Sequence, residues 1–385
     1  RRPALFRLEM QRVTKPEPLF HGMRLTGLLA LSALAWAVWT GLENRRLSDE
    51  LDRQLAAPEC VVRLVGMEGM APDSVGLRLV RGARLLQPPP EPWSWTLSEP
   101  SADVALTAPS GLLDLAFADR RVPVLLQPGD AATFDLSPAP AGFARVFGGP
   151  GLASTGLILE EPRDDEGRVH DTRGFLLAEA EVSVAEFAAF RGSLQASPLD
   201  AAGFSSYCSE LERTLTPDGC QGHLTQASAS LWTDQIGEGT EEHPVRFVSL
   251  LDAMAYCRYI DDLSPGGARH RLPTRSEWER GARGVDGRAF PWGPEPLTPW
   301  RRGAMGRDLR VRGQPDLISP YGLFHMGSGV AEWTLTLEGE RRRFVMGASF
   351  DVSADQIHLG YRVGESPFSR SPTIGFRLLR DERRP

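Results

Sequence analysis

The 385-residue chain has very little of several residue types, and each scarcity limits what it can do. Lysine and asparagine each occur once, as Lys15 and Asn44, which indicates the codon bias of a GC-rich genome rather than a functional patch. A formal charge of −7 argues against a nucleic-acid binder, because such proteins normally present a basic face. A hydrophobic content of 41% is enough to form real cores and excludes wholesale disorder.

Motifs of several common enzyme classes are missing as well. The chain has no P-loop, no nucleophile elbow and no zinc spacing, and its seven histidines form no H-x-x-x-H pair. Of its four cysteines, Cys257 is predicted to lie in the core, on the apolar face of a helix. Cys208 and Cys220 lie in a loop-like insertion, where they could form a disulfide in an oxidising compartment or stay as two unpaired thiols.

An uncharged apolar run, residues 25–42, is long enough to cross a bilayer core at 1.5 Å per residue, about 27 Å in all. Six basic and two acidic residues precede it, so the positive-inside rule places the N-terminus in the cytoplasm. We therefore predict a basic cytoplasmic segment (1–23) and a transmembrane helix (24–42) in a bacterial inner membrane, with periplasmic or extracellular domains after them. A buried core helix and a cleaved signal peptide are the alternatives.

A short helix and a β-rich region are predicted next. In the juxtamembrane segment 43–58, Leu47, Leu51 and Leu55 share one helical face, so residues 44–57 could form a homodimer. An exposed helix that continues the anchor is the alternative. Residues 59–142 are predicted to form a small β-sandwich that acts as a spacer. Its expected strands are the short Val- and Leu-rich segments 60–66, 75–80, 102–107, 111–118, 122–128 and 132–137.

Three helix-start signals appear beyond residue 143. Ser183 precedes Glu186 by three residues, Ser249 precedes Asp252, and Thr274 precedes Glu277, which is the pattern of a capping box. The third helix should end near Gly284. Residues 143–382 are therefore predicted to be an α+β domain with three short helices, irregular loops and late strands.

The same region carries a series of motifs in a specific order. They are EVSVAEFAAF (181–190), HPVRFVSLLDAMAYCRYI (243–260), HRLPTRSEWERGARGVDGRAFPWG (270–293), SPYGLFHMGSGVAEWT (319–334), RRFVMGASF (342–350), GYR (360–362) and IGFRLLR (374–380). This series resembles the formylglycine-generating enzyme, or sulfatase-modifying factor, family. The resemblance implies a C-type-lectin-like fold over residues 143–382. The single transmembrane helix and the small β-sandwich, which are predicted from residue patterns, precede it.

Many residues of these motifs are expected to be structural. Pro273 sets the backbone before a helix cap, and Trp278 supplies a large buried anchor. Partly buried ion pairs or backbone hydrogen bonds are expected for the charged residues. The residues assigned to the structural motif are Arg271, Pro273, Glu277, Trp278, Trp292, Trp333, Gly375 and Arg377.

The resemblance also implies a copper site and a calcium site, and the sequence departs from the family pattern at each of them. The family's copper-binding thiols follow a GGS-aromatic segment, which reads Gly347-Ala-Ser-Phe350 here, yet no cysteine follows Cys257. Because a Cu(I) site needs thiolates, the chain is not expected to make formylglycine. The family's GNVWEW reads SGVAEW, so Gly329 replaces an asparagine ligand and Glu332 is only a weak calcium candidate. No cofactor is expected, with calcium as the alternative.

These observations predict a membrane-anchored, extracytoplasmic ligand-binding or sensor module with a degenerate, non-catalytic domain, that is, a pseudoenzyme. The expected partners are the membrane and a small-molecule, glycan or peptide ligand, and not nucleic acid. Aromatic anchors and charged groups in the family's substrate groove would bind that ligand. The candidate ligand-binding residues are Trp300, Glu332, Ser349, Phe350, His358, Tyr361 and Arg362.

Three further functional hypotheses are compatible with the sequence. The order of segments resembles the extracytoplasmic half of bacterial membrane Ser/Thr protein kinases, with a kinase domain upstream of Arg1. A metal-dependent oxidase of the same family could instead use an acid such as Glu332 without copper thiols. A retroelement-diversified binding protein would have a variable C-terminal segment, often rich in asparagine codons, and residues 342–380 contain no asparagine.

Overall fold

The computed structural model describes residues 59–82, 92–127, 129–152, 169–196, 240–293, 309–339, 341–352 and 358–381. The predicted transmembrane and juxtamembrane helices, the Cys208–Cys220 pair and Trp300 lie outside these ranges. Within them, no helix combines the length and the apolar character that crossing a membrane requires.

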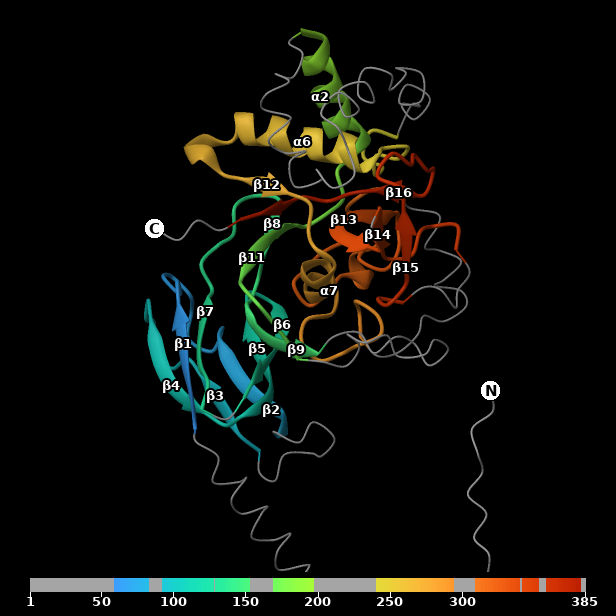
Figure 1. Cartoon of the computed structure of the whole chain (residues 1–385). Helices are drawn as coiled ribbons and strands as arrows, with labels where there is room; N and C mark the ends of the chain where they lie inside the picture. Colours follow the sequence, from blue (N-terminus) through green and yellow to red (C-terminus); the bar gives the residue numbers. More distant parts are fainter. Residues whose placement is uncertain are drawn as a thin grey trace, which may run out of the picture. The chain divides into compact units, whose positions relative to one another are not determined.

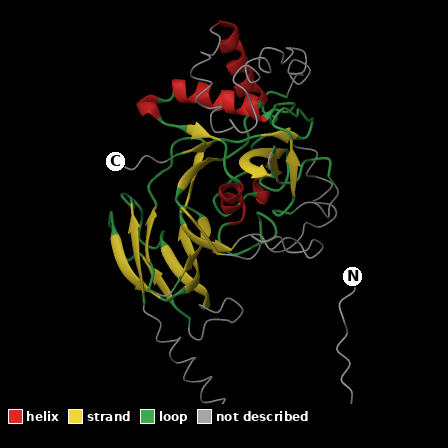
Figure 2. Cartoon of the chain, in the orientation of Figure 1, coloured by secondary structure: helices red, strands yellow, loops and turns green. Residues whose placement is uncertain are grey.

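Two β-sheets form the first part of the described chain (Figures 1 and 2), and their strand orders are β4-β1-β7 and β3-β2-β5-β6. In β1 buried and exposed residues alternate, as expected for a strand with one face toward a core. All six predicted strands are present. The structure adds a seventh, β3, which was not predicted because three residues are too few to show an alternating pattern. The strands are β1 (Cys60–Val65), β2 (Gly76–Gly82), β3 (Ser94–Thr96), β4 (Val104–Ala108), β5 (Gly111–Phe117), β6 (Arg120–Leu126) and β7 (Ala131–Asp135).

The C-terminal region contains two four-stranded sheets, ordered β12-β17-β11-β8 and β15-β14-β13-β16, and a β10-β9 hairpin (Figure 1). Parallel pairing of β13 with β16 mixes directions in the second sheet. The strands are β8 (Phe143–Val146), β9 (Gly149–Leu152), β10 (Val169–Thr172), β11 (Phe175–Ala178), β12 (His270–Arg271), β13 (Ala331–Glu338), β14 (Arg342–Met346), β15 (Arg362–Glu365), β16 (Ile374–Gly375) and β17 (Leu379–Arg380). Short strands and few helices among the described residues make this region α+β.

All three predicted helices are present, and a capping box begins each one. They are α2 (Val184–Ala196), α6 (Leu250–Leu263) and α7 (Arg275–Arg283). Before α2, the Ser183 backbone N–H donates to Glu186 Oε2 (2.7 Å) while the Glu186 N–H donates to Ser183 Oγ (3.3 Å). The same reciprocal pair precedes α6 and α7. Cys257 is buried in α6, as predicted.

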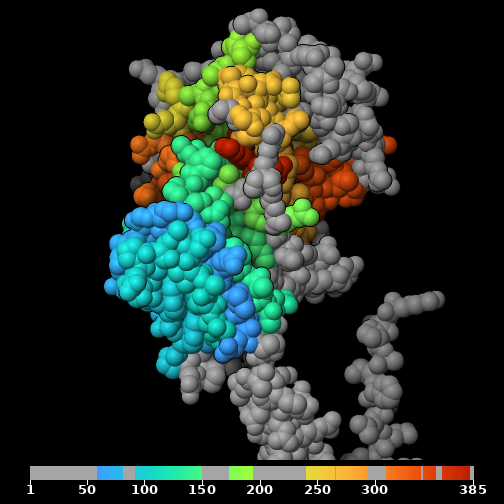
Figure 3. All heavy atoms as spheres, turned by 90° about the vertical axis from the view of Figure 1, so that its left-hand side faces the viewer, coloured from blue at the N-terminus to red at the C-terminus, as the bar shows by residue number. Residues whose placement is uncertain are grey.

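One continuous hydrophobic core includes the sandwich and part of the C-terminal region, and a second core, which contains Phe190 and Trp333, lies within the C-terminal region. The ring centroid of Phe147, which follows β8, lies 5.4 Å from that of Phe134 in β7 and 6.0 Å from that of Tyr321. Arg120 Nη1 donates to the Tyr321 carbonyl (2.6 Å), and a Cβ at Gly322 would lie 2.5 Å from Arg120 Cζ. In Figure 3 the blue and cyan atoms of the sandwich abut the green strands that follow. The sandwich is thus packed against the segment that leads into β13.

Candidate functional site

A fully buried ion pair lies at the centre of the C-terminal region. Arg377 donates through Nε to Glu332 Oε2 and through Nη2 to Glu332 Oε1, both at 2.7 Å. Trp278 Nε1 donates to the same Oε2 atom at 2.9 Å. Burial alone would lower the pKa of Arg377, but the Glu332 carboxylate more than offsets that effect and raises it. Glu332 therefore ties β13 to the C-terminal segment and presents no free carboxylate oxygen to a surface.

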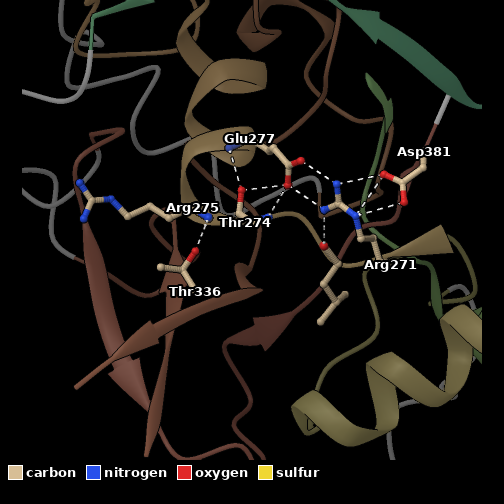
Figure 4. A network of polar contacts seen from close by, with 7 residues as sticks. Arg271, Thr274, Arg275, Glu277, Thr336 and Asp381 are labelled. Atoms are coloured by element: carbon tan, nitrogen blue, oxygen red, sulfur yellow. Dashed lines mark hydrogen bonds and ion pairs between the residues drawn. The ribbon is translucent and has the colours of Figure 1, made fainter. Parts of the chain in front are cut away.

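A second polar network holds the start of α7 (Figure 4). Arg271 forms a two-pronged ion pair with Glu277, with both N–O distances 2.7 Å, and its Nε also donates to Asp381 (3.1 Å). Burial would raise the pKa of Glu277, yet the Arg271 guanidinium holds that pKa below its usual range. Because Glu277 is also the acid of the capping box with Thr274, its carboxylate links the helix start to Arg271 of β12, which in turn binds Asp381.

Replacing Thr274 with alanine tests the cap in this network. We expect Thr274→Ala to lower the free energy of unfolding by about 1 kcal/mol, because the Glu277 N–H loses the Thr274 oxygen that it donates to. Chemical denaturation of the full chain measures the change. Thr133→Ala, at an exposed position of β7, is the matched control and should change stability by less than about 0.5 kcal/mol. Equal losses in both variants would mean that the cap adds nothing.

A third buried polar group, which the sequence analysis did not identify, lies beside the central ion pair. Glu181 and His325 are each 2% exposed, and Glu181 Oε2 lies 3.4 Å from His325 Nδ1. Burial opposes charge on both groups. Their mutual attraction wins, however, so His325 lowers the pKa of Glu181 and Glu181 raises the pKa of His325. Glu181 lies just after β11 and His325 lies in a distant loop, so no regular spacing in the sequence could have predicted that they pair.

Five of the seven predicted ligand-binding residues come together in two adjoining segments, 347–352 and 358–362. The Gly347 N–H donates to the Tyr361 carbonyl (3.1 Å) and joins the two segments. The five residues are Ser349, Phe350, His358, Tyr361 and Arg362, and all except the buried Ser349 are half-buried. The sixth, Glu332, is in the core, and the seventh, Trp300, lies outside the described residues.

The side chains of these two segments contact one another and neighbouring elements, and Arg246 lies over the Phe350 ring at 5.6 Å. Ser349 Oγ lies 2.5 Å from Asp351 Oδ1, and the rings of His358 and Tyr361 meet edge to face at 6.2 Å. His358 Nδ1 accepts from the Gly360 N–H (3.1 Å), and Arg362 lies over the Phe344 ring at 5.9 Å. The surface therefore offers aromatic faces beside a guanidinium and an imidazole, which suits an aromatic or anionic ligand group.

The two tryptophans of the structural motif differ in burial. Trp333 is fully buried, and its Nε1 donates to the Val248 carbonyl (2.9 Å), as expected of a core residue. Trp292 is half-buried and stacks on Phe290, with ring centroids 5.3 Å apart and an interplanar angle of 12°. A Cβ added at Gly327 would lie 3.1 Å from Pro291 and 3.9 Å from Trp292 Cζ3, so the Trp292 ring packs against this backbone. Trp292 thus both packs inward and is accessible to solvent.

Neither metal site implied by the family resemblance fits the residues present. The chain has no cysteine after Cys257, so no thiolate is available for Cu(I) in either surface segment. Calcium takes six to eight oxygen ligands, but both Glu332 oxygens already accept from Arg377 or Trp278. Gly329 has no side chain to contribute, and the described residues contain no cluster of three or more metal-binding side chains.

Comparison with known proteins is consistent with this description. The family model "Sulfatase-modifying factor enzyme 1-like domain" matches residues 139–382. "Inactive C-alpha-formylglycine-generating enzyme 2" of Mus musculus is 31% identical over 183 residues, which are 40% of this chain and 56% of that protein. "Formylglycine-generating enzyme" of Streptomyces coelicolor is 29% identical over 310 residues, 66% of this chain and 95% of that protein.

The matches are partial in length. This chain spans 56% of the mouse protein and 66% of its Bos taurus counterpart. Among solved structures, the crystal structure of CarF is similar over 63% of this chain and 99% of CarF, at 17% identity and a TM-score of 0.41.

Proposed function

This chain belongs to the sulfatase-modifying factor family, and from that membership we propose that it is a non-catalytic, ligand-binding module with the formylglycine-generating-enzyme fold. The observation that carries this proposal is the absence of cysteine beyond Cys257. Two similar proteins are named as inactive, whereas the Streptomyces relative is named as the enzyme, so relatives alone do not decide. The lack of thiolates in this region supports the non-catalytic proposal, because copper-thiolate chemistry requires them.

The proposed ligand surface consists of segments 347–352 and 358–362. Phe350 and Tyr361 supply half-exposed aromatic rings, and His358 and Arg362 supply polar groups beside them. Aromatic and arginine side chains are enriched among the residues that contribute most of the free energy of binding at an interface. The ligand class that this composition favours is a small molecule, glycan or peptide with an aromatic or anionic group.

We further propose that this module acts outside a membrane, as a sensor. The uncharged run 25–42 and the basic segment before it support an anchored topology with the C-terminal region outside. A kinase domain upstream would make the module the sensor half of a Ser/Thr kinase. Sequencing the gene upstream of Arg1 tests this, and a stop codon without a kinase catalytic loop would refute it.

The first functional test asks for catalysis. The full chain in detergent, supplied with copper or iron, oxygen and cysteine-containing peptides, is expected to leave the peptide thiols unchanged. Mass spectrometry and an aldehyde probe measure the outcome, with an active formylglycine-generating enzyme as positive control. Oxygen-dependent aldehyde formation by this chain would overturn the non-catalytic proposal and favour the oxidase alternative.

A second test asks for binding at the proposed surface. We expect one or more members of a peptide, glycan and metabolite panel to raise the Tm of the full chain. Phe350→Ala or Tyr361→Ala should lower the apparent affinity for that ligand at least tenfold, which corresponds to about 1.4 kcal/mol of binding free energy. Val61→Ala, an exposed position of the sandwich that is 52% accessible, is the control and should bind normally. Binding that both surface variants retain would place the ligand elsewhere.

A further inference from the structure

Four charged groups meet in the interior of the C-terminal region. Glu181, Glu332 and Arg377 are each at most 2% exposed, and so is His325. Arg377 donates to both carboxylate oxygens of Glu332 and also, through Nη2, to the carbonyl of Phe324, the residue before His325 (2.8 Å). Glu181, His325, Glu332 and Arg377 form a buried cluster that we call the charge quartet. Burial raises the pKa of Glu332, while the two hydrogen bonds from Arg377 favour its ionised form. With both carboxylates ionised, the net charge of the quartet is zero when the imidazole is protonated and −1 when it is not.

Half of the charge quartet is poorly satisfied by hydrogen bonds. Both carboxylate oxygens of Glu181 and both ring nitrogens of His325 are buried without a hydrogen-bond partner, and Ser328 Oγ nearby is in the same position. The 3.4 Å approach of Glu181 to His325 is therefore chiefly an attraction between charges. Burying polar atoms without hydrogen-bond partners lowers the stability of the folded state. The attraction between Glu181 and His325 offsets this cost only when both groups are charged.

The backbone around Gly329 brings this pair directly under the proposed ligand surface. Gly329 has φ 74°, and a Cβ there would lie 2.5 Å from Glu181 Oε1 and 2.9 Å from His325 Nδ1. The Gly329 carbonyl accepts the N–H of Phe350 (2.8 Å). His325 itself has φ 57°, an uncommon conformation for a residue other than glycine, so this turn needs its side-chain contacts to persist.

We propose that a proton on His325 supplies the internal cation of this site, in place of a bound metal ion, and that the 325–329 turn and the Phe350 backbone stay in position only while His325 is charged. Calcium does not fit here, because Arg377 and an imidazolium already provide the positive charge beside the two carboxylates. The charged groups that face His325 are Glu181 after β11, Glu332 in β13 and Arg377 after β16. The proposal does not depend on whether the protein is catalytic.

The sign of the pH dependence follows from linkage. The pKa of His325 is raised in the folded protein, so its contribution is fully present below the unfolded value of about 6.5 and is lost as pH rises through the folded value. The pKa of Glu181 is lowered, so its contribution is lost only as pH falls through that lower folded value, in acid. Each unit by which the His325 pKa rises corresponds to about a tenfold change in the folding equilibrium constant.

The experiment compares wild-type chain, His325→Gln and the double variant Glu181→Gln/His325→Gln, each full length in detergent. Denaturation midpoints are measured from about pH 6 to about pH 9, a range that spans the unperturbed histidine pKa. We expect the folding equilibrium constant of the wild type to fall at least tenfold over this range, because the folded state, in which the pKa of His325 is raised, holds the proton more tightly than the unfolded state. The double variant should lack that loss because both charges are gone. His325→Gln should be the least stable of the three near pH 6, since Glu181 is left without its partner.

Two measurements keep the test decisive if a variant does not fold. Histidine NMR of the wild type should show one imidazole that titrates above the ordinary value, together with a shift of the Phe350 amide resonance at the same pH. Calcium and EDTA should leave the wild-type midpoint unchanged near pH 6. An equal pH dependence in wild type and double variant, no histidine with a raised pKa, or stabilisation by calcium would each overturn the proposal.

Discussion

Replacing Arg377 with methionine is expected to lower the free energy of unfolding by about 3–5 kcal/mol, because it leaves the Glu332 carboxylate buried without a counter-charge. Both carboxylate oxygens are involved, at 2.7 Å each, and both residues are fully buried. Of the hydrogen bonds that Glu332 accepts from Arg377 and Trp278, only that of the Trp278 indole N–H would remain. Urea denaturation of the full chain, followed by tryptophan fluorescence, measures the loss.

Two further variants show whether burial causes this effect. Arg78→Met removes an ion pair of similar length, 3.0 Å to Asp114, in which the arginine side chain is 59% exposed, so the cost should be at most about 1 kcal/mol. The double variant Glu332→Met/Arg377→Met should be more stable than Arg377→Met alone, since no unpaired charge is left in the core. If Arg78→Met and Arg377→Met cost the same, the buried pair is not what holds β13 in place.

Phe147→Ala is expected to cost about 3–5 kcal/mol as well, through a cavity between the two parts of the described chain. The Phe147 ring contacts Phe117 and Phe134 of the sandwich and Tyr321 of the C-terminal region, with centroid distances of 5.7, 5.4 and 6.0 Å. Because the core is continuous, the loss should lower the stability of both parts together. Far-ultraviolet circular dichroism and tryptophan fluorescence should then report one coincident transition.

Phe368→Ala is the matched control for this cavity. Phe368 is 41% exposed, so its truncation should cost about 1 kcal/mol or less. Two separate transitions in the wild type would contradict a shared core, because a spacer domain with its own core would unfold by itself. A small loss in Phe147→Ala with a single transition would instead place the coupling in polar contacts such as that of Arg120 with Tyr321.

Local sequence signals identified most of the secondary structure. The hydroxyl–acid pairs before α2, α6 and α7 mark helix starts because the groups that satisfy the first N–H donors lie within three residues. Alternation in the sandwich strands is similarly local. The chemistry of the motif residues predicted ion-pair roles for Arg271, Glu277 and Arg377 and a core role for Trp278, and the structure places all four in such roles.

The sequence could not identify partners that lie far apart in the chain. Glu181 and His325 lie in two different motif segments, 181–190 and 319–334, and are separated by more than 140 residues, so no short spacing links them. Their pairing results from the way β11 and the 319–330 loop pack around Gly329, where no side chain fits. The shared core at Phe147 is equally invisible in a linear pattern, because its ring contacts come from three separate segments.

By itself, the sequence therefore determined the family, the fold class and the absence of copper thiols, since these depend on residue identity and on short-range order. Only the tertiary structure decided which charges are buried together and which candidate residues share a surface. The physical reason is that the energy of a charge depends on its surroundings: an acid in water needs no partner, whereas Glu181 and Glu332, removed from solvent, need theirs. Packing sets those surroundings, and packing is made by segments that the chain order keeps apart.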